Sequence, residues 1–266
     1  MKNKFGKPFA KKSLGQNFLI DQNYIGKIIS ALNPQPNDTI IEIGPGRGAL
    51  TEHLVESGSN IVAIELDRNL VPLLQKEFAI YTNFRVFEED ALQIDFSKLR
   101  ITNSESQKFK LVANLPYYIS TAILQRLIEQ RELFSKFVLM LQREVVDRIT
   151  APIGNSERGF LTVLVEAYCE AEKLFDVPPT AFRPTPKVWS SVVKLEVKKT
   201  QIIHNEKAFR ELLSIGFSQK RKTILNNLKA KFPNAVEALE YSKIGSIRRA
   251  ETLTLDEWIS LASQLK

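Results

Sequence analysis

The chain has few of the residues on which disulfide or metal chemistry depends. Its 266 residues include one cysteine, Cys169, and two histidines, His53 and His204. A single cysteine cannot form an internal disulfide, and the nearest histidine does not lie at the spacing of a metal motif. We therefore expect a protein of a reducing compartment with no bound metal, in which both histidines have structural roles.

Long apolar runs are also lacking. No apolar stretch approaches the roughly 20 residues that span a bilayer. The basic start of the chain is followed by polar residues 13–17, where a signal peptide would have an apolar core. The 44% hydrophobic content still suffices for a full core, and the length suits one large domain with a small one. We expect a cytoplasmic protein that does not meet a membrane.

Basic residues outnumber acidic ones and are clustered. The formal net charge is +7, and no acidic residue precedes Asp21. The clusters are Lys2, Lys4, Lys7, Lys11 and Lys12 at the start, Lys220, Arg221 and Lys222 with Lys229 and Lys231 later, and finally Arg248 and Arg249. Most charge runs are simply solvated surface. Because few acids separate these residues, the pattern favours a polyanionic partner, namely a nucleic acid.

Strand and helix patterns alternate through the first half of the chain. The expected strands are residues 39–43, 60–65, 84–87, 109–113 and 137–141, and the expected helices between them are 49–57, 70–78 and 122–129. This order predicts an α/β fold with a doubly wound, mostly parallel sheet that binds ligands at the carboxyl ends of its strands.

The composition changes in the last quarter of the chain. A proline-rich loop at 182–187 leads into an alternating strand at 192–197. The segments 204–217, 221–231 and 255–264 then have helical periodicity. We predict a main domain over residues 1–198 and a small α-helical domain over 199–266.

Ligand-binding features follow the predicted strands. Gly44, Gly46 and Gly48 lie where a strand meets a helix, and they allow a bulky ligand to approach the backbone. Glu65 ends the next strand and can accept hydrogen bonds from ribose hydroxyls, and Asp90 can accept from the amine of a cofactor adenine. Alternatively the loop is a structural turn and the two acids are exposed loop carboxylates, but their succession at strand ends favours binding.

The tetrapeptide Asn114-Leu115-Pro116-Tyr117 follows another predicted strand. The lone pair of an aromatic amine is delocalised, and two acceptors on its hydrogens help to localise it. The Asn114 Oδ1 atom and the carbonyl of Leu115 or Pro116 can be these acceptors. Pro116 fixes the turn, and Tyr117 can stack on a flat base. An ordinary strand-to-loop turn is the alternative.

Several motifs in this order resemble the ribosomal small-subunit RNA adenine dimethyltransferases, a family that uses S-adenosylmethionine. The matching segments are Lys12-Ser13-Leu14-Gly15-Gln16-Asn17-Phe18-Leu19-Ile20-Asp21, Glu42-Ile43-Gly44-Pro45-Gly46-Arg47-Gly48, Asn114-Leu115-Pro116-Tyr117-Tyr118-Ile119-Ser120-Thr121 and Phe182-Arg183-Pro184-Thr185-Pro186-Lys187-Val188. The resemblance extends over nearly the whole chain.

The resemblance implies a Rossmann-like methyltransferase domain, a helical domain that contacts RNA, and an S-adenosylmethionine site. The implied cofactor-binding residues are Asn17, Leu19, Gly44, Gly46, Glu65, Asp90 and Asn114. The implied catalytic residues are Asn114, Pro116, Tyr117 and Phe182, with Phe182 stacking on the face of the target adenine opposite Tyr117. A core aromatic is the alternative for Phe182.

The implied reaction is dimethylation of two adjacent adenosines in a hairpin near the 3′ end of small-subunit RNA. The amine attacks the sulfonium methyl group in line, and S-adenosylhomocysteine leaves. The expected partner is this RNA or the assembling small subunit. A monomer is expected, although the sequence does not itself give the oligomeric state.

Three other functions stay open on the sequence alone. They are a large-subunit RNA adenine methyltransferase of the macrolide-resistance type, a DNA adenine methyltransferase, and a non-catalytic assembly or transcription factor.

Two residues depart from the family pattern, since Tyr118 and Trp189 stand where the family more often has Asn and Asp. These two departures concern contacts around the target base, not the reaction.

Overall fold

The computed structural model describes residues 10–99, 108–200 and 203–265. The chain divides into two compact units. Unit 1 consists of the residues up to Val146 together with Glu172–Val197, and unit 2 consists of Asp147–Ala171 together with the residues from Lys198 onward. Each unit is described by itself below.

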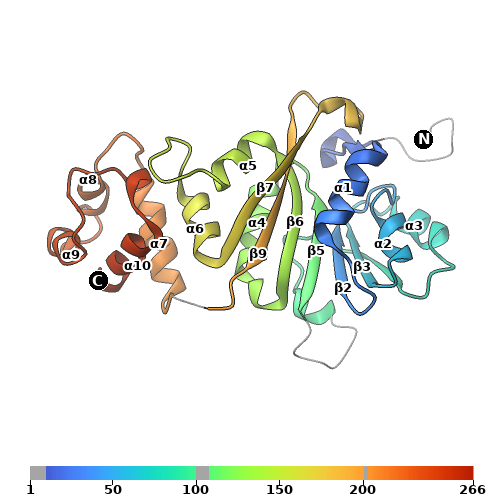
Figure 1. Ribbon diagram of the computed structural model, residues 1–266, viewed down its shortest axis with the longest axis horizontal. Coiled ribbons are helices and arrows are strands. Elements are labelled where there is room, and N and C mark those ends of the chain that lie inside the picture. The colour runs from blue at the N-terminus through green and yellow to red at the C-terminus, as the bar shows by residue number, and fades with distance from the viewer. Residues whose placement is uncertain (1–9, 100–107, 201–202, 266) are drawn as a thin grey trace. The chain divides into compact units, whose positions relative to one another are not determined.

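The centre of unit 1 is a seven-stranded sheet in the order β4-β3-β2-β5-β6-β9-β7 (Figure 1). The strands are β2 (Thr39–Ile43), β3 (Asn60–Glu65), β4 (Phe84–Glu88), β5 (Phe109–Asn114), β6 (Phe134–Gln142), β7 (Cys169–Val177) and β9 (Ser190–Val197). The first five strands in this order are parallel, and β9 runs antiparallel to β6. The predicted α/β fold with a mostly parallel sheet is confirmed.

Helices cover the sheet with apolar faces. They are α1 (Gln22–Leu32), α2 (Thr51–Glu56), α3 (Val71–Glu77) and α4 (Ser120–Glu129), and α5 (Arg143–Ile149) runs from unit 1 into unit 2. In α1 the Asp21 side chain caps the amino end by accepting from the Asn23 N–H, and Ile25, Ile28 and Leu32 are buried at helical spacing. This face of α1 packs against β5 and β6, which brings the preceding N-terminal segment over the sheet.

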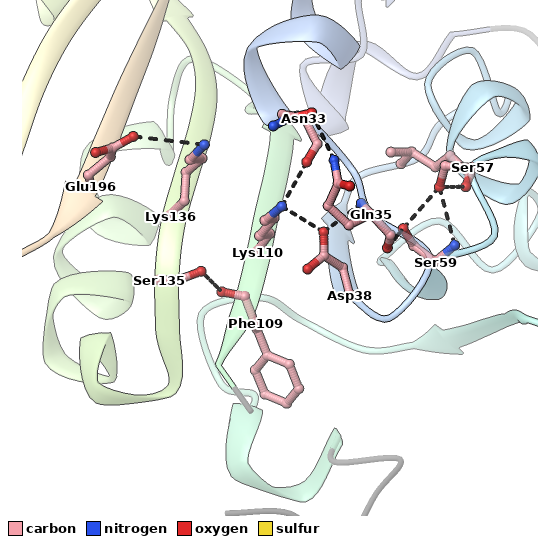
Figure 2. A network of polar contacts seen from close by, with 11 residues as sticks. Asn33, Gln35, Asp38, Ser57, Ser59, Phe109, Lys110, Ser135, Lys136 and Glu196 are labelled. Carbon is pink, nitrogen blue, oxygen red and sulfur yellow. Dashed lines mark hydrogen bonds and ion pairs between the residues drawn. The ribbon is translucent and has the colours of Figure 1, made fainter. Parts of the chain in front are cut away.

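A polar network fixes the amino ends of the central strands (Figure 2). The Lys110 ammonium of β5 donates to the Asn33 carbonyl at 2.7 Å and to Asp38 Oδ2 at 2.6 Å. Asp38 Oδ2 also accepts from the Gln35 N–H, and Ser59 Oγ donates to the Gln35 carbonyl. The α1–β2 loop is therefore attached to β5 and β3 at the end of the sheet opposite the carboxyl ends of the parallel strands.

Two short strands form a second, antiparallel sheet. β1 (Phe18–Leu19) pairs with β8 (Phe182–Arg183), so that Leu19 lies opposite Phe182. The Ile20 N–H also donates to the Ala181 carbonyl at 2.9 Å. This pairing holds the N-terminal segment, which the sequence analysis implicated in cofactor binding, against a late loop.

Unit 2 is helical, with α6 (Phe160–Tyr168), α7 (Glu206–Gly216), α8 (Ile224–Leu228), α9 (Ala235–Tyr241) and α10 (Leu255–Gln264). The buried Trp258 of α10 packs on Gly216 so closely that a Cβ atom there would lie 2.5 Å from the indole. Arg248 binds both carboxylate oxygens of Glu257 and the Thr252 carbonyl. Its charge is therefore used inside the unit, unlike that of the exposed Arg249.

The helical unit is larger than the small domain that the composition suggested. The sequence analysis predicted a main domain that extends to residue 198. In the structure, however, residues 147–171 belong to unit 2. The reason is that α6 packs against α7 and α10. The assignment of catalysis to one part and RNA contact to the other stays a prediction.

Candidate active site

A cavity of about 370 Å³ opens at the carboxyl ends of the parallel strands of unit 1. Most of its lining comes from five segments, residues 14–20, 42–50, 64–66, 89–91 and 114–119. It contains each of the seven predicted cofactor-binding residues, namely Asn17, Leu19, Gly44, Gly46, Glu65, Asp90 and Asn114, and also Pro116 and Tyr117. These residues come from positions up to 100 apart in the chain, so the fold gathers them as the order of motifs predicted.

The glycine loop forms the floor of this cavity. Gly44, Gly46 and Gly48 all have positive φ, at 69°, 59° and 82°, a backbone region that residues with a Cβ rarely adopt. At Gly48 a Cβ atom would lie 2.8 Å from the Phe78 ring. The backbone conformation therefore favours glycine at all three positions, and packing also requires it at Gly48. The loop lines the cavity, where a ligand can reach it.

Glu65 is held at the end of β3 by backbone donors. Its Oε1 accepts from the Asp67 N–H at 2.8 Å, and its Oε2 accepts from the Gly46 N–H at 3.1 Å. Burial raises the pKa of Glu65, while these two bonds oppose the shift. The fixed carboxylate retains lone pairs for a diol such as the ribose hydroxyls.

Glu42 is a buried acid that also lines the cavity. Thr51 Oγ1 donates to it at 2.7 Å. Burial is the largest influence and raises the Glu42 pKa to about 7, with the Thr51 bond opposing and the nearby Glu65 charge adding to the shift. Glu42, bound by a side-chain hydroxyl, and Glu65, bound by backbone N–H groups, therefore both lie beside the glycine loop.

Asp90 follows β4 at the rim of the cavity. Its Oδ1 accepts from the Leu92 N–H at 2.9 Å and its Oδ2 from the Gln93 side chain at 3.2 Å. These bonds orient the carboxylate on a short turn. That Asp90 receives the amine of a cofactor adenine stays a prediction, and its place on the lining is compatible with it.

Asp67 lies outside the cavity lining, but it positions the N-terminal segment in a way that the sequence analysis missed. It is buried, and it accepts from the Lys11 ammonium at 2.6 Å and from Gln16 Nε2 at 3.0 Å. Burial by itself raises its pKa, but the bonds from Lys11, Asn69 and Gln16 outweigh burial and hold the pKa below its ordinary value. Asp67 therefore fastens the N-terminal segment over the cavity, and the only signal was a second acid two residues after Glu65.

This attachment changes the interpretation of the N-terminal lysines. Lys11 belonged to the cluster expected to contact nucleic acid, but its ammonium is paired with Asp67. Lys2, Lys4 and Lys7 lie outside the described residues. Lys220, Arg221 and Lys222 are exposed in unit 2, and their contact with RNA stays a prediction.

Asn114 ends β5 with its side chain oriented by the N-terminal segment. Asn114 Nδ2 donates to the Asn17 carbonyl at 3.0 Å. With the amide nitrogen bound in this way, Oδ1 is the atom that can accept from a substrate amine. The Pro116 carbonyl already accepts from the Ile119 N–H at 3.2 Å, so of the two carbonyls considered from the sequence, that of Leu115 is the better second acceptor.

Tyr117 is fixed through its hydroxyl. Its Oη lies 2.7 Å from Ser190 Oγ, which is buried at the start of β9. Partial burial raises the Tyr117 pKa, and the Ser190 bond opposes the shift. The bond joins positions 73 residues apart, so Ser190, a second missed residue, holds the plane of the ring that was predicted to stack on the base.

Phe182 does not line the cavity. Its side chain is 2% exposed, belongs to the apolar core, and lies in β8 opposite Leu19. Phe182 is therefore a core aromatic in this structure, which is the alternative that the sequence analysis gave for it. Its contacts give no support to the implied base-stacking role.

The described parts of the chain hold no group of three or more His, Cys, Asp and Glu side chains that could bind a metal ion. No helix among these residues is long and apolar enough to cross a membrane.

Comparisons with known proteins show the family to which the chain belongs. The family model "Ribosomal RNA adenine dimethylase" matches residues 9–266. The protein "Ribosomal RNA small subunit methyltransferase A" of Saccharophagus degradans is 41% identical, with 100% of this chain and 99% of that protein covered. The protein of the same name from Clostridium botulinum (strain Kyoto) is 42% identical, with coverages of 94% and 92%.

Solved structures show the same fold. A dimethyladenosine transferase from Plasmodium falciparum has a TM-score of 0.79 at 29% identity, with 92% of this chain and 95% of that chain covered. The 23S rRNA methyltransferase ErmE has a TM-score of 0.73 at 23% identity, with coverages of 94% and 99%. At that identity, the second similarity shows the fold alone.

The cavity and the comparisons lead to one assignment. A cavity lined by the glycine loop and by the carboxylates of Glu65 and Asp90 is compatible with S-adenosylmethionine, the cofactor of this family. The chain belongs to the ribosomal RNA adenine dimethylase family and is an S-adenosylmethionine-dependent methyltransferase.

Proposed function

We propose that this protein dimethylates the exocyclic amines of two adjacent adenosines in a hairpin near the 3′ end of small-subunit ribosomal RNA. The proposal includes the naked RNA or the assembling small subunit as substrate and the cytoplasm as the place of action. The chemistry is supported by Asn114, whose amide is oriented from Asn17 at the mouth of the cofactor cavity. The substrate is supported by the printed names of relatives about 40% identical.

The residues of this chain have three tasks in the reaction. Glu65, Asp90 and the glycine loop hold the cofactor, which supplies a sulfonium methyl group when bound. Asn114 Oδ1 and the Leu115 carbonyl accept the two amine hydrogens, which localises the nitrogen lone pair for attack. Tyr117 holds the plane of the base, and Ser190 holds Tyr117.

No general base is required by this scheme. The cavity lining that the structure describes contains neither His nor Lys. The methylated amine is a cation that loses its proton readily to water. Catalysis therefore rests on proximity and on acceptors aimed before the substrate arrives.

Transfer of labelled methyl groups tests this proposal. The substrates are small subunits from a methylation-deficient strain, large subunits, and naked small-subunit RNA, and the labelled bases are then mapped. The proposal predicts dimethyladenosine at adjacent positions of small-subunit RNA. Label in large-subunit RNA would overturn the proposed substrate, and absence of label despite cofactor binding would favour an assembly factor without catalytic activity.

A further inference from the structure

Two exposed aromatic side chains lie on the segments that the Tyr117–Ser190 hydrogen bond joins. Tyr118 follows Tyr117 and is 61% exposed, and Trp189 precedes Ser190 and is 44% exposed. An exposed aromatic side chain is common on a protein surface, but these two lie beside the turn that carries Asn114 and Tyr117. The Tyr118 ring lies close to Gly15 and lines the cofactor cavity, whereas Trp189 lies outside the cavity lining.

The segment around Trp189 is also cationic. The Arg143 guanidinium lies over the Trp189 ring at 5.8 Å, and the Arg143 N–H donates to the Trp189 carbonyl at 3.0 Å. Arg183 and Lys187, in the same late loop, are exposed. The nearby acid Asp176 accepts from Ser191 Oγ and is paired with Lys173 at 2.9 Å. Lys173 therefore offsets the negative charge of Asp176 near this segment.

We propose that Trp189, with Arg143 beside it, binds the nucleotide next to the target adenosine, the base stacking on the indole and its phosphate meeting the guanidinium. Tyr118 extends this surface toward the catalytic turn. An aromatic face next to a cation is the usual arrangement for unpaired nucleotides. The exposed cations Arg143, Arg183 and Lys187 favour a polyanionic partner. The inference rests on the proposed RNA substrate and adds a residue that selects and positions it.

Tryptophan fluorescence gives a direct test, because only two tryptophans are present and Trp258 is buried. Acrylamide therefore quenches mainly Trp189. Saturating hairpin RNA should lower the quenching constant at least about twofold, whereas heparin, a polyanion without bases, should not. Equal protection by heparin, or no protection by RNA, would overturn the stacking proposal.

Kinetics of the full-length enzyme provide the second readout. Trp189→Ala should raise KM for hairpin RNA about tenfold, the size of one lost base–aromatic stack, with cofactor binding unchanged. Trp189→Phe should restore most of this loss, and Arg143→Gln should lower the salt slope of RNA binding by about one. The control is Ile80→Ala, a large apolar side chain 83% exposed in unit 1, which should leave KM unchanged.

The outcomes separate this inference from the proposed function. If the wild-type enzyme methylates small-subunit RNA but Trp189→Ala behaves as wild type, the inference alone fails. If RNA protects Trp189 yet no methyl group is transferred, the surface is confirmed and the proposed function fails.

Discussion

At the scale of single residues, Glu42 makes the stability of the unliganded protein depend on pH. Its pKa in the folded protein is about 7, against 4.5 for an ordinary glutamate. Between these values the folded protein keeps a proton that the unfolded chain has lost, so Glu42 costs stability as pH rises through this window. The total is about 3 kcal/mol.

Glu42→Gln removes this titration. Urea unfolding at pH 4.5 and pH 8 should show the variant gaining about 3 kcal/mol relative to wild type at the higher pH. The same change at the exposed Glu56 gives the reference for losing a surface carboxylate. A Glu42→Gln difference that stays constant with pH would show that the buried carboxyl ionises normally.

Phe182 is a second case in which burial decides the expected effect. Because its ring is part of the core, Phe182→Ala should lower the free energy of unfolding by about 3 kcal/mol or more. The exposed Val188, in the same loop, provides a mild control as Val188→Ala. Unchanged stability with lost methyl transfer would contradict the core role and restore the base-stacking one.

At the scale of elements, paired lysines on neighbouring strands provide a matched experiment. Lys110 of β5 lies opposite Lys136 of β6. Lys110 donates to Asp38 and to the Asn33 carbonyl at short distances, whereas Lys136, which is about equally buried, lies 3.8 Å from the half-exposed Glu196 (Figure 2).

Replacing each lysine by methionine should therefore have different effects. Lys110→Met leaves Asp38 without its ion pair, and we expect a loss of about 2 kcal/mol in thermal or urea unfolding. Lys136→Met should change stability by less than about 0.5 kcal/mol. Equal effects of the two substitutions would mean that the network at the amino ends does not hold the sheet.

The elements also show what local sequence can predict. β3 and α10 have the predicted ends, residues 60–65 and 255–264. The first is a continuous apolar run, and the second begins with a capping box of Thr254 and Glu257. α6 was missed because it is buried on nearly all sides, which removes the amphipathic signal.

The same distinction applies to the site. The glycine loop, Glu65, Asp90 and Asn114 were found because each follows a recognisable strand. Asp67 and Ser190 were missed because their partners, Lys11 and Tyr117, are 56 and 73 residues away in the chain. The stacking role of Phe182 stays a prediction that its burial does not support, since whether an aromatic lies in a core or a cleft depends on packing that a motif does not contain.

At the scale of the whole molecule, the net charge of +7 does not show which of the cations are available to RNA. Lys11 is paired with Asp67 and Arg248 with Glu257, so both serve the fold. Lys220, Arg221 and Lys222 lie exposed in a turn between α7 and α8. Their long-range attraction for a polyanion is the property that we expect RNA binding to use.

Replacing Lys220, Arg221 and Lys222 together by glutamine should weaken RNA binding and lower its salt slope by about two units, as expected for two to three lost phosphate contacts. The measurement is the RNA dissociation constant over a range of salt concentrations. Lys231→Gln is the control, since Lys231 lies 3.4 Å from Glu211 within the unit. An unchanged salt slope in the triple variant would show that these three residues are solvated surface and do not contact RNA.

The central claim is that the turn after β5 performs methyl transfer within a cofactor site that the rest of unit 1 builds. The most direct measurement compares Asn114→Ala with wild type for both S-adenosylmethionine binding and single-turnover transfer to small-subunit RNA. We predict retained cofactor binding and transfer slowed by a factor of about 100 or more, as for a lost transition-state acceptor. Near-normal transfer in this variant would contradict the account.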